Sequence, residues 1–157
     1  MPVRDAVPDD LDEICSIIRE LAEFEQAAGE VEFDRDVLAG HLFGPDAVAR
    51  VLIAEPAGRP GTTAGMALWY RTFSTWVGRP GVWLEDLFIR PDYRRQGLAG
   101  ELLAALGRRS EGRVEWAVLD WNTSAITMYR SIGAEPVLGW TRYRWVPAAG
   151  DLIPADR

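Results

Sequence analysis

Apolar residues recur along the chain with two different periods, which predict alternating strands and helices. A helical spacing of apolar residues begins near residues 8–10 and ends before Gly29. Shorter apolar runs bounded by Gly and Pro are typical of strands. The predicted strands are 3–6, 48–54, 64–72, 82–89, 113–119 and a final pair near 135–146, and the other predicted helices are 34–42, 97–109 and 123–132. This order predicts one mixed α/β domain, in which helices cover the faces of a sheet.

The most informative part of the pattern is a strand, a polar turn and a helix start in residues 84–100. The strand ends at Pro91, because proline has no backbone donor for a sheet. Small residues at Gly97, Ala99 and Gly100 open the next helix and leave its first amides uncovered, so that these amides can hold a phosphate or pyrophosphate. A plain strand-to-helix connection is the alternative. The two common nucleotide loops are excluded, since the chain has no lysine and no Gly-x-Gly-x-x-Gly.

Length and composition indicate a soluble protein. The 157 residues can bury a full core, and no apolar run approaches the ~20 residues that span a bilayer. The N-terminus has no apolar signal segment and the single Cys15 cannot form an internal disulfide, so we expect a cytoplasmic protein. We expect no metal, because no Cys/His spacing supports one. The domain is expected to cover residues 1–146, and the Ala- and Pro-rich segment 147–157 is expected to be a flexible tail.

Negative charge is concentrated at the start of the chain. Residues 1–40 contain twelve Asp or Glu against three Arg, and the whole chain carries a formal charge of −7. Nucleic-acid binding needs a basic surface, so the sequence argues against it. An acidic surface would attract a cationic small molecule, although solvated helix faces are the more ordinary explanation.

Two motifs resemble the GNAT family of N-acetyltransferases. Residues 94–99 (Arg-Arg-Gln-Gly-Leu-Ala) fit its coenzyme pattern Gln/Arg-x-x-Gly-x-Gly/Ala, and residues 122–134 fit its pattern Asn-x-x-Ala/Ser-x-x-x-Tyr-x-x-x-Gly-Ala/Phe. Residues 20–25, 76–78 and 84–89 also resemble the spermidine/spermine (diamine) and thialysine acetyltransferase branch. The resemblance covers residues 1–146. It implies the α/β GNAT fold, a mixed and mostly antiparallel sheet with splayed central parallel strands and helices on both faces.

The resemblance implies that acetyl-CoA is the co-substrate. Its pyrophosphate would lie on the turn, its pantetheine arm would pair with the central strand, and the second motif would contact it from the next parallel strand. The implied coenzyme-binding residues are Leu87, Phe88, Ile89, Arg94, Arg95, Gln96, Gly97, Leu98, Ala99, Gly100, Asn122 and Ser124. For Asn122, capping of helix 123–132 is an alternative role.

Amine acetylation needs a group that removes the ammonium proton, donors for an oxyanion and a proton for the departing thiolate. By resemblance, Glu85 is the base, directly or through a water, and Tyr129 is the general acid at the sulfur. A backbone N–H near residues 87–89 would hold the oxyanion. An ion pair with an arginine is the alternative for Glu85, and a place in the core is the alternative for Tyr129. Asp86 is the second candidate for base or amine anchor, and strand alternation predicts that it points away from Glu85.

The resemblance also implies the acceptor side of the site. The residues expected to line it are Glu23, Glu25, Glu85, Asp86 and Trp76. The expected acceptor is a small cationic amine, either a polyamine or a diamino acid such as thialysine, and the expected assembly is a homodimer with acceptor pockets near the subunit boundary. Gln26 and Ala27 stand where the branch has a second aromatic residue and further acids, which weakens the case for a polyamine. A protein or antibiotic amine, or a non-catalytic CoA-binding module, are the alternatives.

Overall fold

The computed structural model describes residues 2–148 of the chain. The chain divides after Leu119 into two compact units, Met1–Leu119 and Asp120–Arg157. Among the described residues, the first unit holds every strand and the helices α1 to α3, and the second unit holds α4 (Thr123–Ser131). The expectation of one domain over residues 1–146 stays a prediction. Most of the expected tail, residues 149–157, lies outside the described residues.

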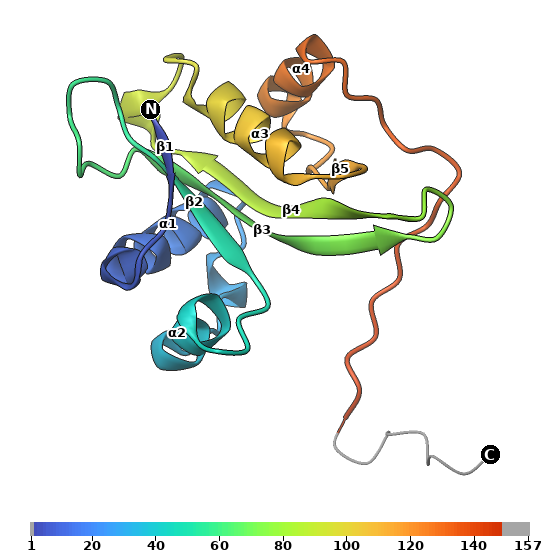
Figure 1. Ribbon diagram of the computed structural model, residues 1–157, viewed down its shortest axis with the longest axis horizontal. Coiled ribbons are helices and arrows are strands. Elements are labelled where there is room, and N and C mark those ends of the chain that lie inside the picture. Colours follow the sequence, from blue (N-terminus) through green and yellow to red (C-terminus); the bar gives the residue numbers. More distant parts are fainter. Residues whose placement is uncertain (1, 149–157) are drawn as a thin grey trace. The chain divides into compact units, whose positions relative to one another are not determined.

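The first unit is built on a five-stranded mixed sheet in the order β1-β2-β3-β4-β5 (Figure 1). β1 to β4 pair antiparallel with their neighbours, whereas β4 and β5 run parallel. This arrangement confirms the expected mixed, mostly antiparallel sheet. The strands are β1 (Val3–Asp5), β2 (Arg50–Ala54), β3 (Gly65–Ser74), β4 (Arg79–Ile89) and β5 (Val114–Trp116).

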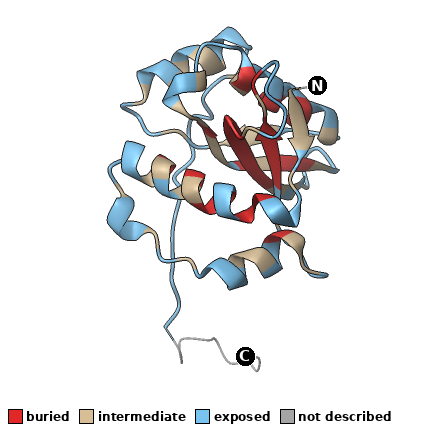
Figure 2. Ribbon diagram, turned by 90° about the vertical axis from the view of Figure 1, so that its left-hand side faces the viewer, coloured by how far each residue is buried: buried red, intermediate tan, exposed pale blue. Residues whose placement is uncertain are grey.

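Helices cover both faces of this sheet. α1 (Leu11–Phe24) and α2 (Arg35–Phe43) lie on one face, and α3 (Leu98–Arg109) lies on the other (Figure 1). Their apolar sides face the sheet, where the buried residues concentrate (Figure 2). The 3-10 turns are Pro8–Asp10, Ala28–Glu30 and Pro91–Tyr93. The core on the α1 side is formed by Ile14, Ile17, Leu21, Leu42, Val51, Ile53, Met66, Leu68 and Phe88.

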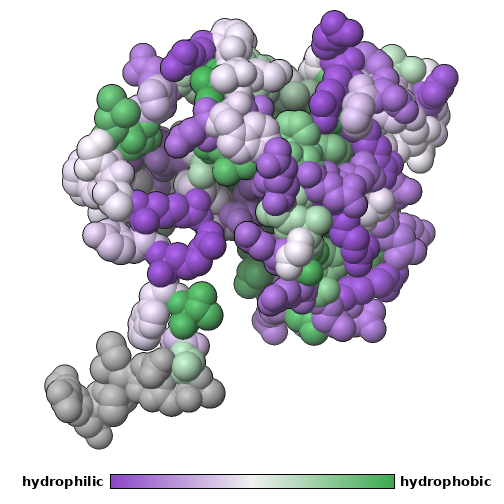
Figure 3. Space-filling view, turned by 180° about the vertical axis from the view of Figure 1, so that it is seen from behind, coloured by the Kyte–Doolittle hydropathy of each residue, from purple (hydrophilic) through white to green (hydrophobic). Residues whose placement is uncertain are grey.

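Hydrophilic side chains cover much of the face seen in Figure 3, with smaller apolar areas between them. No helix among the described residues is long and apolar enough to cross a membrane. Cys15 is a free cysteine buried in α1, where it belongs to the core. The fold therefore accounts for the apolar pattern of the first unit mainly as core.

The predicted strands differ from the structure most in the second half of the chain. The strand expected at 113–119 is short, because β5 pairs with β4 only from Val114 to Trp116. The final pair of strands expected near 135–146 is wrong, since the described part of this segment contains no strand. A strand needs a hydrogen-bonded neighbour, and the second unit offers only α4 in its described residues. The alternating apolar residues of this segment remain largely exposed: Val137, Leu138, Trp140, Tyr143, Trp145 and Val146.

A paired carboxylate holds the first strand to the start of α1. Both terminal nitrogens of Arg4 donate to Asp10, at 2.7 and 2.8 Å, and the Val7 amide donates to the same carboxylate at 2.8 Å. Arg4 Nε also donates to Glu55 at 2.8 Å. The Arg4 guanidinium lowers the pKa of Asp10 below its usual value. The folded protein therefore favours the charged form of this nearly buried carboxylate.

We expect Asp10→Asn to lower the free energy of unfolding by about 1–3 kcal/mol, because a charge-assisted hydrogen bond is lost from Arg4. A carboxylate with a lowered folded-state pKa stabilises the fold above its unfolded pKa, and that contribution is lost as the pH falls through the folded-state value. The loss of free energy of unfolding in Asp10→Asn, measured by urea unfolding, should therefore be largest at neutral pH and smaller in acid. Asp9→Asn is the matched control, since Asp9 is exposed. Equal unfolding midpoints for the two variants would contradict this account.

Candidate active site

The turn between β4 and α3 presents a set of backbone amides. After the 3-10 turn Pro91–Tyr93, Arg95 and Gly97 take left-handed backbone conformations, with φ of 59° and 79°. Gly97 is the N-cap of α3, and in the described part of the chain no side chain at this cap accepts a hydrogen bond from the first turn. The first amides of a helix have no intrahelical partner and carry the positive end of its dipole. The turn can therefore bind an anionic group.

The helix behind this turn is fixed by its apolar side. Leu98, Leu102 and Leu106 are buried, and they hold the start of α3 against the sheet. At Gly100, an added Cβ would meet no other atom within 4 Å, so the surface of this first turn is open. The predicted helix over 97–109 is confirmed, since α3 covers Leu98–Arg109. The turn therefore leads into a helix whose position on the sheet is fixed by buried leucines.

β4 and β5 separate beside this turn. They pair over only three residues each, from Val82 to Leu84 and from Val114 to Trp116, whereas β4 continues to Ile89. No described strand pairs with this edge of β4 beyond Leu84. The backbone groups of residues 85–89 on this side can therefore pair with an extended ligand as an added strand would. The sheet therefore shows the expected splay, because the two parallel strands stop pairing after Leu84 of β4 and Trp116 of β5.

A β-bulge places two acidic residues on one face of the sheet. Trp69 lies opposite Leu84 and Leu68 lies opposite Asp86, so Glu85 is an extra residue in β4. Residues directly opposite each other in an antiparallel pair share a face. Asp86 therefore lies on the face of Leu68, where α1 packs. The expectation that Asp86 points away from Glu85 does not hold, because the bulge interrupts the alternation of side chains.

Glu85 is held by a side chain of its own strand. The indole Nε1 of Trp83 donates to Glu85 Oε2 at 2.8 Å. Trp83 lies opposite Tyr70, two residues beyond Leu68 on β3, and so on the same face as Asp86. Glu85 is exposed, and among the described residues it makes no ion pair with an arginine. Trp83 was missed as a site residue, although its spacing of two from Glu85 could have indicated it.

Asp86 is the carboxyl group whose titration is displaced most. Burial, together with the negative charges of Glu85 and Glu25, raises its pKa to about 6. Burial also raises the pKa of Glu25, which follows the last residue of α1. The effect of Glu25 on Asp86, together with the shared face of Asp86 and Glu85, means that three carboxyl groups lie near one another on the α1 face of β4. Such a cluster attracts a cation and can exchange a proton near neutral pH.

Two arginines tie the end of β4 to α1. Arg90 pairs with Glu13 at 2.7 Å and with Glu20 at 2.8 Å, both on α1. Arg94 donates from Nε to the carbonyl of Ile89 at 2.9 Å. The Arg94 guanidinium also lies 5.4 Å from the centroid of the Phe24 ring. Arg94 therefore joins the turn to the end of α1 through side-chain contacts. The sequence pattern did not indicate this connection.

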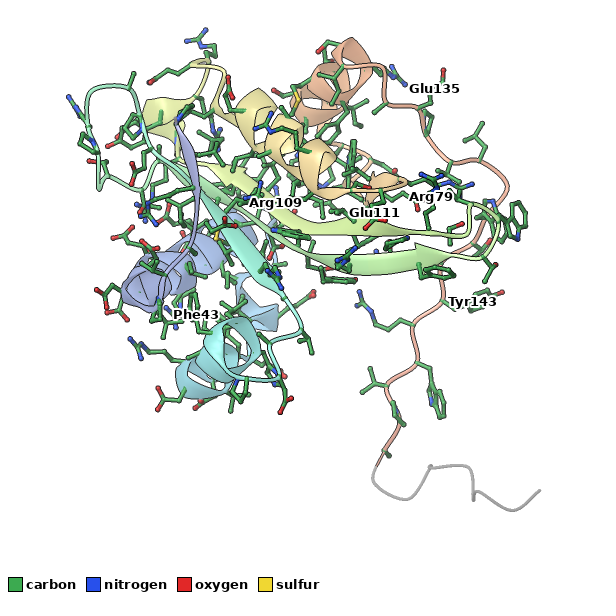
Figure 4. All side chains as sticks on the ribbon, in the orientation of Figure 1. Phe43, Arg79, Arg109, Glu111, Glu135 and Tyr143 are labelled. Atoms are coloured by element: carbon green, nitrogen blue, oxygen red, sulfur yellow. The ribbon has the colours of Figure 1, made fainter. Side chains whose placement is uncertain are left out.

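Trp76 lies far from the carboxyl groups along its own chain. It is in the turn that joins β3 to β4 and is 80% exposed. Arg79, at the outer end of this hairpin (Figure 4), is six residues before Glu85. At about 3.3 Å per residue, an extended strand of that length spans roughly 20 Å. The structure thus does not bring Trp76 together with Glu25, Glu85 and Asp86 within the first unit.

The second unit carries the other expected residues on or beside α4. Asn122 Oδ1 accepts a hydrogen bond from the Ala125 amide at 3.3 Å, so Asn122 caps this helix. Ser124 is exposed in the first turn, and Tyr129 is half-buried two residues before the end. The roles of these residues toward a coenzyme stay predictions. No cluster of His, Cys, Asp or Glu among the described residues could hold a metal ion.

Comparisons with known proteins define the family. Residues 12–134 match the acetyltransferase (GNAT) family, and the chain belongs to that family. A thialysine N-epsilon-acetyltransferase of Caenorhabditis elegans is 38% identical over 149 residues, covering 90% of this chain and 89% of that protein. The thialysine N-epsilon-acetyltransferase of Mus musculus is 33% identical over 155 residues, covering 91% of each. The crystal structure of a probable acetyltransferase superposes with a TM-score of 0.75 at 20% identity, covering 95% of this chain and 99% of that one.

These matches make the protein an N-acetyltransferase of the branch that contains the spermidine/spermine and thialysine enzymes. Its motifs and its fold agree with that assignment. Enzymes of the GNAT family take the acetyl group from acetyl-CoA.

Proposed function

We propose that the protein transfers the acetyl group of acetyl-CoA directly to a primary amine of a small cationic substrate. The observation that carries this proposal is the gathering of Glu25, Glu85 and Asp86 beside the open edge of β4. A cationic amine has its strongest partners in such a group of carboxylates. The names of the relatives, which act on thialysine, support a diamino acid as acceptor, and a polyamine is the second choice.

The residues of the turn and of β4 suit the coenzyme. We propose that the amides of residues 96–100 hold its diphosphate, with help from Arg94 and Arg95. The backbone of residues 87–89 would pair with its pantetheine amides along the open edge of β4. Asn122 and Ser124 are proposed as further contacts on the resemblance alone. When bound, the coenzyme supplies a thioester that an amine can attack.

We propose that Glu85 and Asp86 act as a pair on the acceptor amine. An ammonium has no lone pair, so its proton must move to a base before nitrogen attacks the carbonyl carbon. Glu85 is the base that the resemblance names. Trp83 orients its carboxylate by donating to Oε2, and Oε1 can then accept a hydrogen bond from a water or from the ammonium. Asp86 has the pKa of about 6 that suits a proton acceptor at neutral pH.

The remaining steps use a backbone amide and Tyr129. A backbone N–H of residues 87–89 would stabilise the oxyanion that forms when the carbon–nitrogen bond is made. The carbon–sulfur bond then breaks, and we propose that the Tyr129 hydroxyl gives its proton to the thiolate. A phenol is neutral at physiological pH and can therefore donate.

Tyr129→Phe should lower kcat by roughly 100-fold, because general acid catalysis contributes about that much or more. The Kd of CoA should change by less than about threefold, well under the ~1.4 kcal/mol of a tenfold change. Stopped-flow turnover and calorimetric CoA binding measure the two quantities. A parallel loss of CoA affinity would instead make Tyr129 a structural residue.

We propose a homodimer in which the hairpin arm, residues 72–80, contacts a second copy. Phe73, Trp76 and Val77 are exposed on this arm, and no other described strand pairs with it. Its only charged residue is Arg79, which complements the acidic acceptor side of another copy. Trp76, too distant in its own chain, could reach an acceptor site by this route.

Replacing both Phe73 and Trp76 with serine should therefore convert the dimer to a monomer of about half the mass, as light scattering would show. Exposed apolar groups on such an arm gain from burial at an interface. Val37→Ser on α2, which replaces another exposed apolar residue, should leave the dimer intact. A wild-type protein that is monomeric at micromolar concentration would contradict the proposal.

An amine panel tests the proposed activity. Thiol release from acetyl-CoA should be fastest with small diamines or diamino acids and slow with neutral amines. Preference for an aminoglycoside or a peptide amine would support the rival acceptors. Binding of acetyl-CoA without thiol release for any amine would support a non-catalytic CoA-binding module, and it would overturn the proposal.

A further inference from the structure

Arg94 connects the turn before α3 to the end of α1. Its Nε donates to the Ile89 carbonyl at 2.9 Å, at the end of β4. Its guanidinium carbon lies 5.4 Å from the centroid of the Phe24 ring and 5.6 Å from that of the Phe88 ring. A guanidinium over aromatic faces is attracted by their negative charge density. One side chain of the turn therefore contacts the last residues of both α1 and β4.

The end of α1 carries one of the three acceptor-side carboxylates. Glu25 directly follows Phe24, and its amide donates to the Leu21 carbonyl at 2.9 Å. The chain then turns sharply, since Gln26 has a left-handed φ of 60° and the Ala27 amide donates back to Ala22 at 2.8 Å. Glu25 is thus fixed to the last turn of α1. A displacement of Phe24 would move the Glu25 backbone with it.

Arg94 is a local contact, because other groups hold α1 on the sheet. Arg90 pairs with Glu13 and Glu20 in the first and middle turns of the helix. The apolar side of α1 is buried at Ile14, Ile17 and Leu21. Phe24 is 38% exposed and lies beyond these anchors, where its ring also packs near that of Phe88, with 6.4 Å between the ring centroids. Loss of the Arg94 side chain should therefore loosen the last turn of α1 without detaching the helix.

We propose that Arg94 is a positioning residue that couples the coenzyme turn to Glu25 and so to the acceptor. The inference rests on the proposed function, since it requires a diphosphate at the turn and an amine at the carboxylates. A diphosphate held by residues 96–100 fixes the backbone of the turn, Arg94 fixes Phe24, and Glu25 is held beside Asp86. Because such coupling is reciprocal, coenzyme and amine would each increase the affinity for the other.

Hydrogen exchange tests this coupling without a chemical step. In the wild type, saturating CoA should slow exchange of the Glu25, Gln26 and Ala27 amides several-fold. In Arg94→Gln at saturating CoA this slowing should vanish. Arg95→Gln is the matched control, because it removes the neighbouring charge of the same turn. It should keep the slowing once CoA is saturating, even where its CoA affinity is lower.

Steady-state kinetics supply the second readout. At saturating CoA, which offsets any loss of a diphosphate contact, Arg94→Gln should raise the KM of the best amine by roughly fivefold or more, the usual lower range of an allosteric coupling. Arg94→Lys, which keeps a cation near the two rings, should recover part of the lost affinity.

The outcomes separate this inference from the proposed function. Unchanged slowing of the three amides in Arg94→Gln, or their indifference to CoA in a wild type that binds it, would overturn the coupling alone. A wild type that binds neither CoA nor any amine would overturn both proposals, and this is seen before any variant is made.

Discussion

Replacing Gly97 with glutamate is expected to abolish binding of CoA. Gly97 is the N-cap of α3 and has a φ of 79°, which a residue with a side chain adopts at a cost of about 1–3 kcal/mol. The new carboxylate would also lie among the amides that we assign to the diphosphate. Loss of one or two hydrogen bonds to a charged group costs about 1.5–3 kcal/mol each. The Kd of CoA should therefore rise by at least about 100-fold.

Two further variants separate the causes of this effect. Gly97→Ala has the same backbone strain without the charge, and an added Cβ meets no other atom within 4 Å, so its effect on CoA should be smaller. Gly107→Glu places the same charge near the far end of α3, where an added Cβ also meets nothing. It should bind CoA like the wild type in isothermal calorimetry. If Gly97→Glu bound CoA with wild-type affinity, the turn could not be the diphosphate site.

Replacing Asp86 with asparagine is expected to lower kcat/KM by roughly 100-fold or more, the contribution of a general base. The pKa of this carboxyl is raised to about 6 by burial and by its acidic neighbours, and a base works only when deprotonated. The wild-type kcat/KM should therefore rise with pH through about 6 and level off above it. In Asp86→Asn this limb should disappear from the profile measured between pH 5 and 8.

The stability of the same variant provides a control. A carboxyl with a raised folded-state pKa destabilises the fold at pH values above that pKa, because the charged form is disfavoured there. Asp86→Asn should therefore unfold at a temperature equal to or above that of the wild type at pH 7.5. Glu85→Gln, beside it, tests the base that the resemblance names. Loss of the acid limb in Glu85→Gln but not in Asp86→Asn would assign the proton transfer to Glu85.

The turn and α3 could be predicted from sequence because local residues decide them. Pro91 ends the strand, Gly97 permits the left-handed conformation, and leucines at helical spacing bury one side of the helix. The same local logic predicted the antiparallel strands of the first unit. The coenzyme and the general-acid role of Tyr129 were expected from the family motifs alone, because no local pattern indicates them.

Other features could not be predicted, because they depend on pairing between distant residues. The bulge at Glu85 follows from the register of β4 against β3, and it reverses the expected face of Asp86. The bridge from Arg94 to Phe24 joins residues seventy positions apart. The alternating apolar residues of 135–146 resembled strands, but a periodic pattern contains no information about whether a partner strand is available.

The proposed activity depends on the amides of residues 96–100, which would hold a diphosphate and so direct a thioester along β4. A crystal structure with saturating CoA tests it most directly. We expect diphosphate oxygens about 2.7–3.2 Å from those amide nitrogens, the range of ordinary hydrogen bonds. Amides that stay empty, or that are capped by side chains of the protein while CoA binds elsewhere, would contradict it.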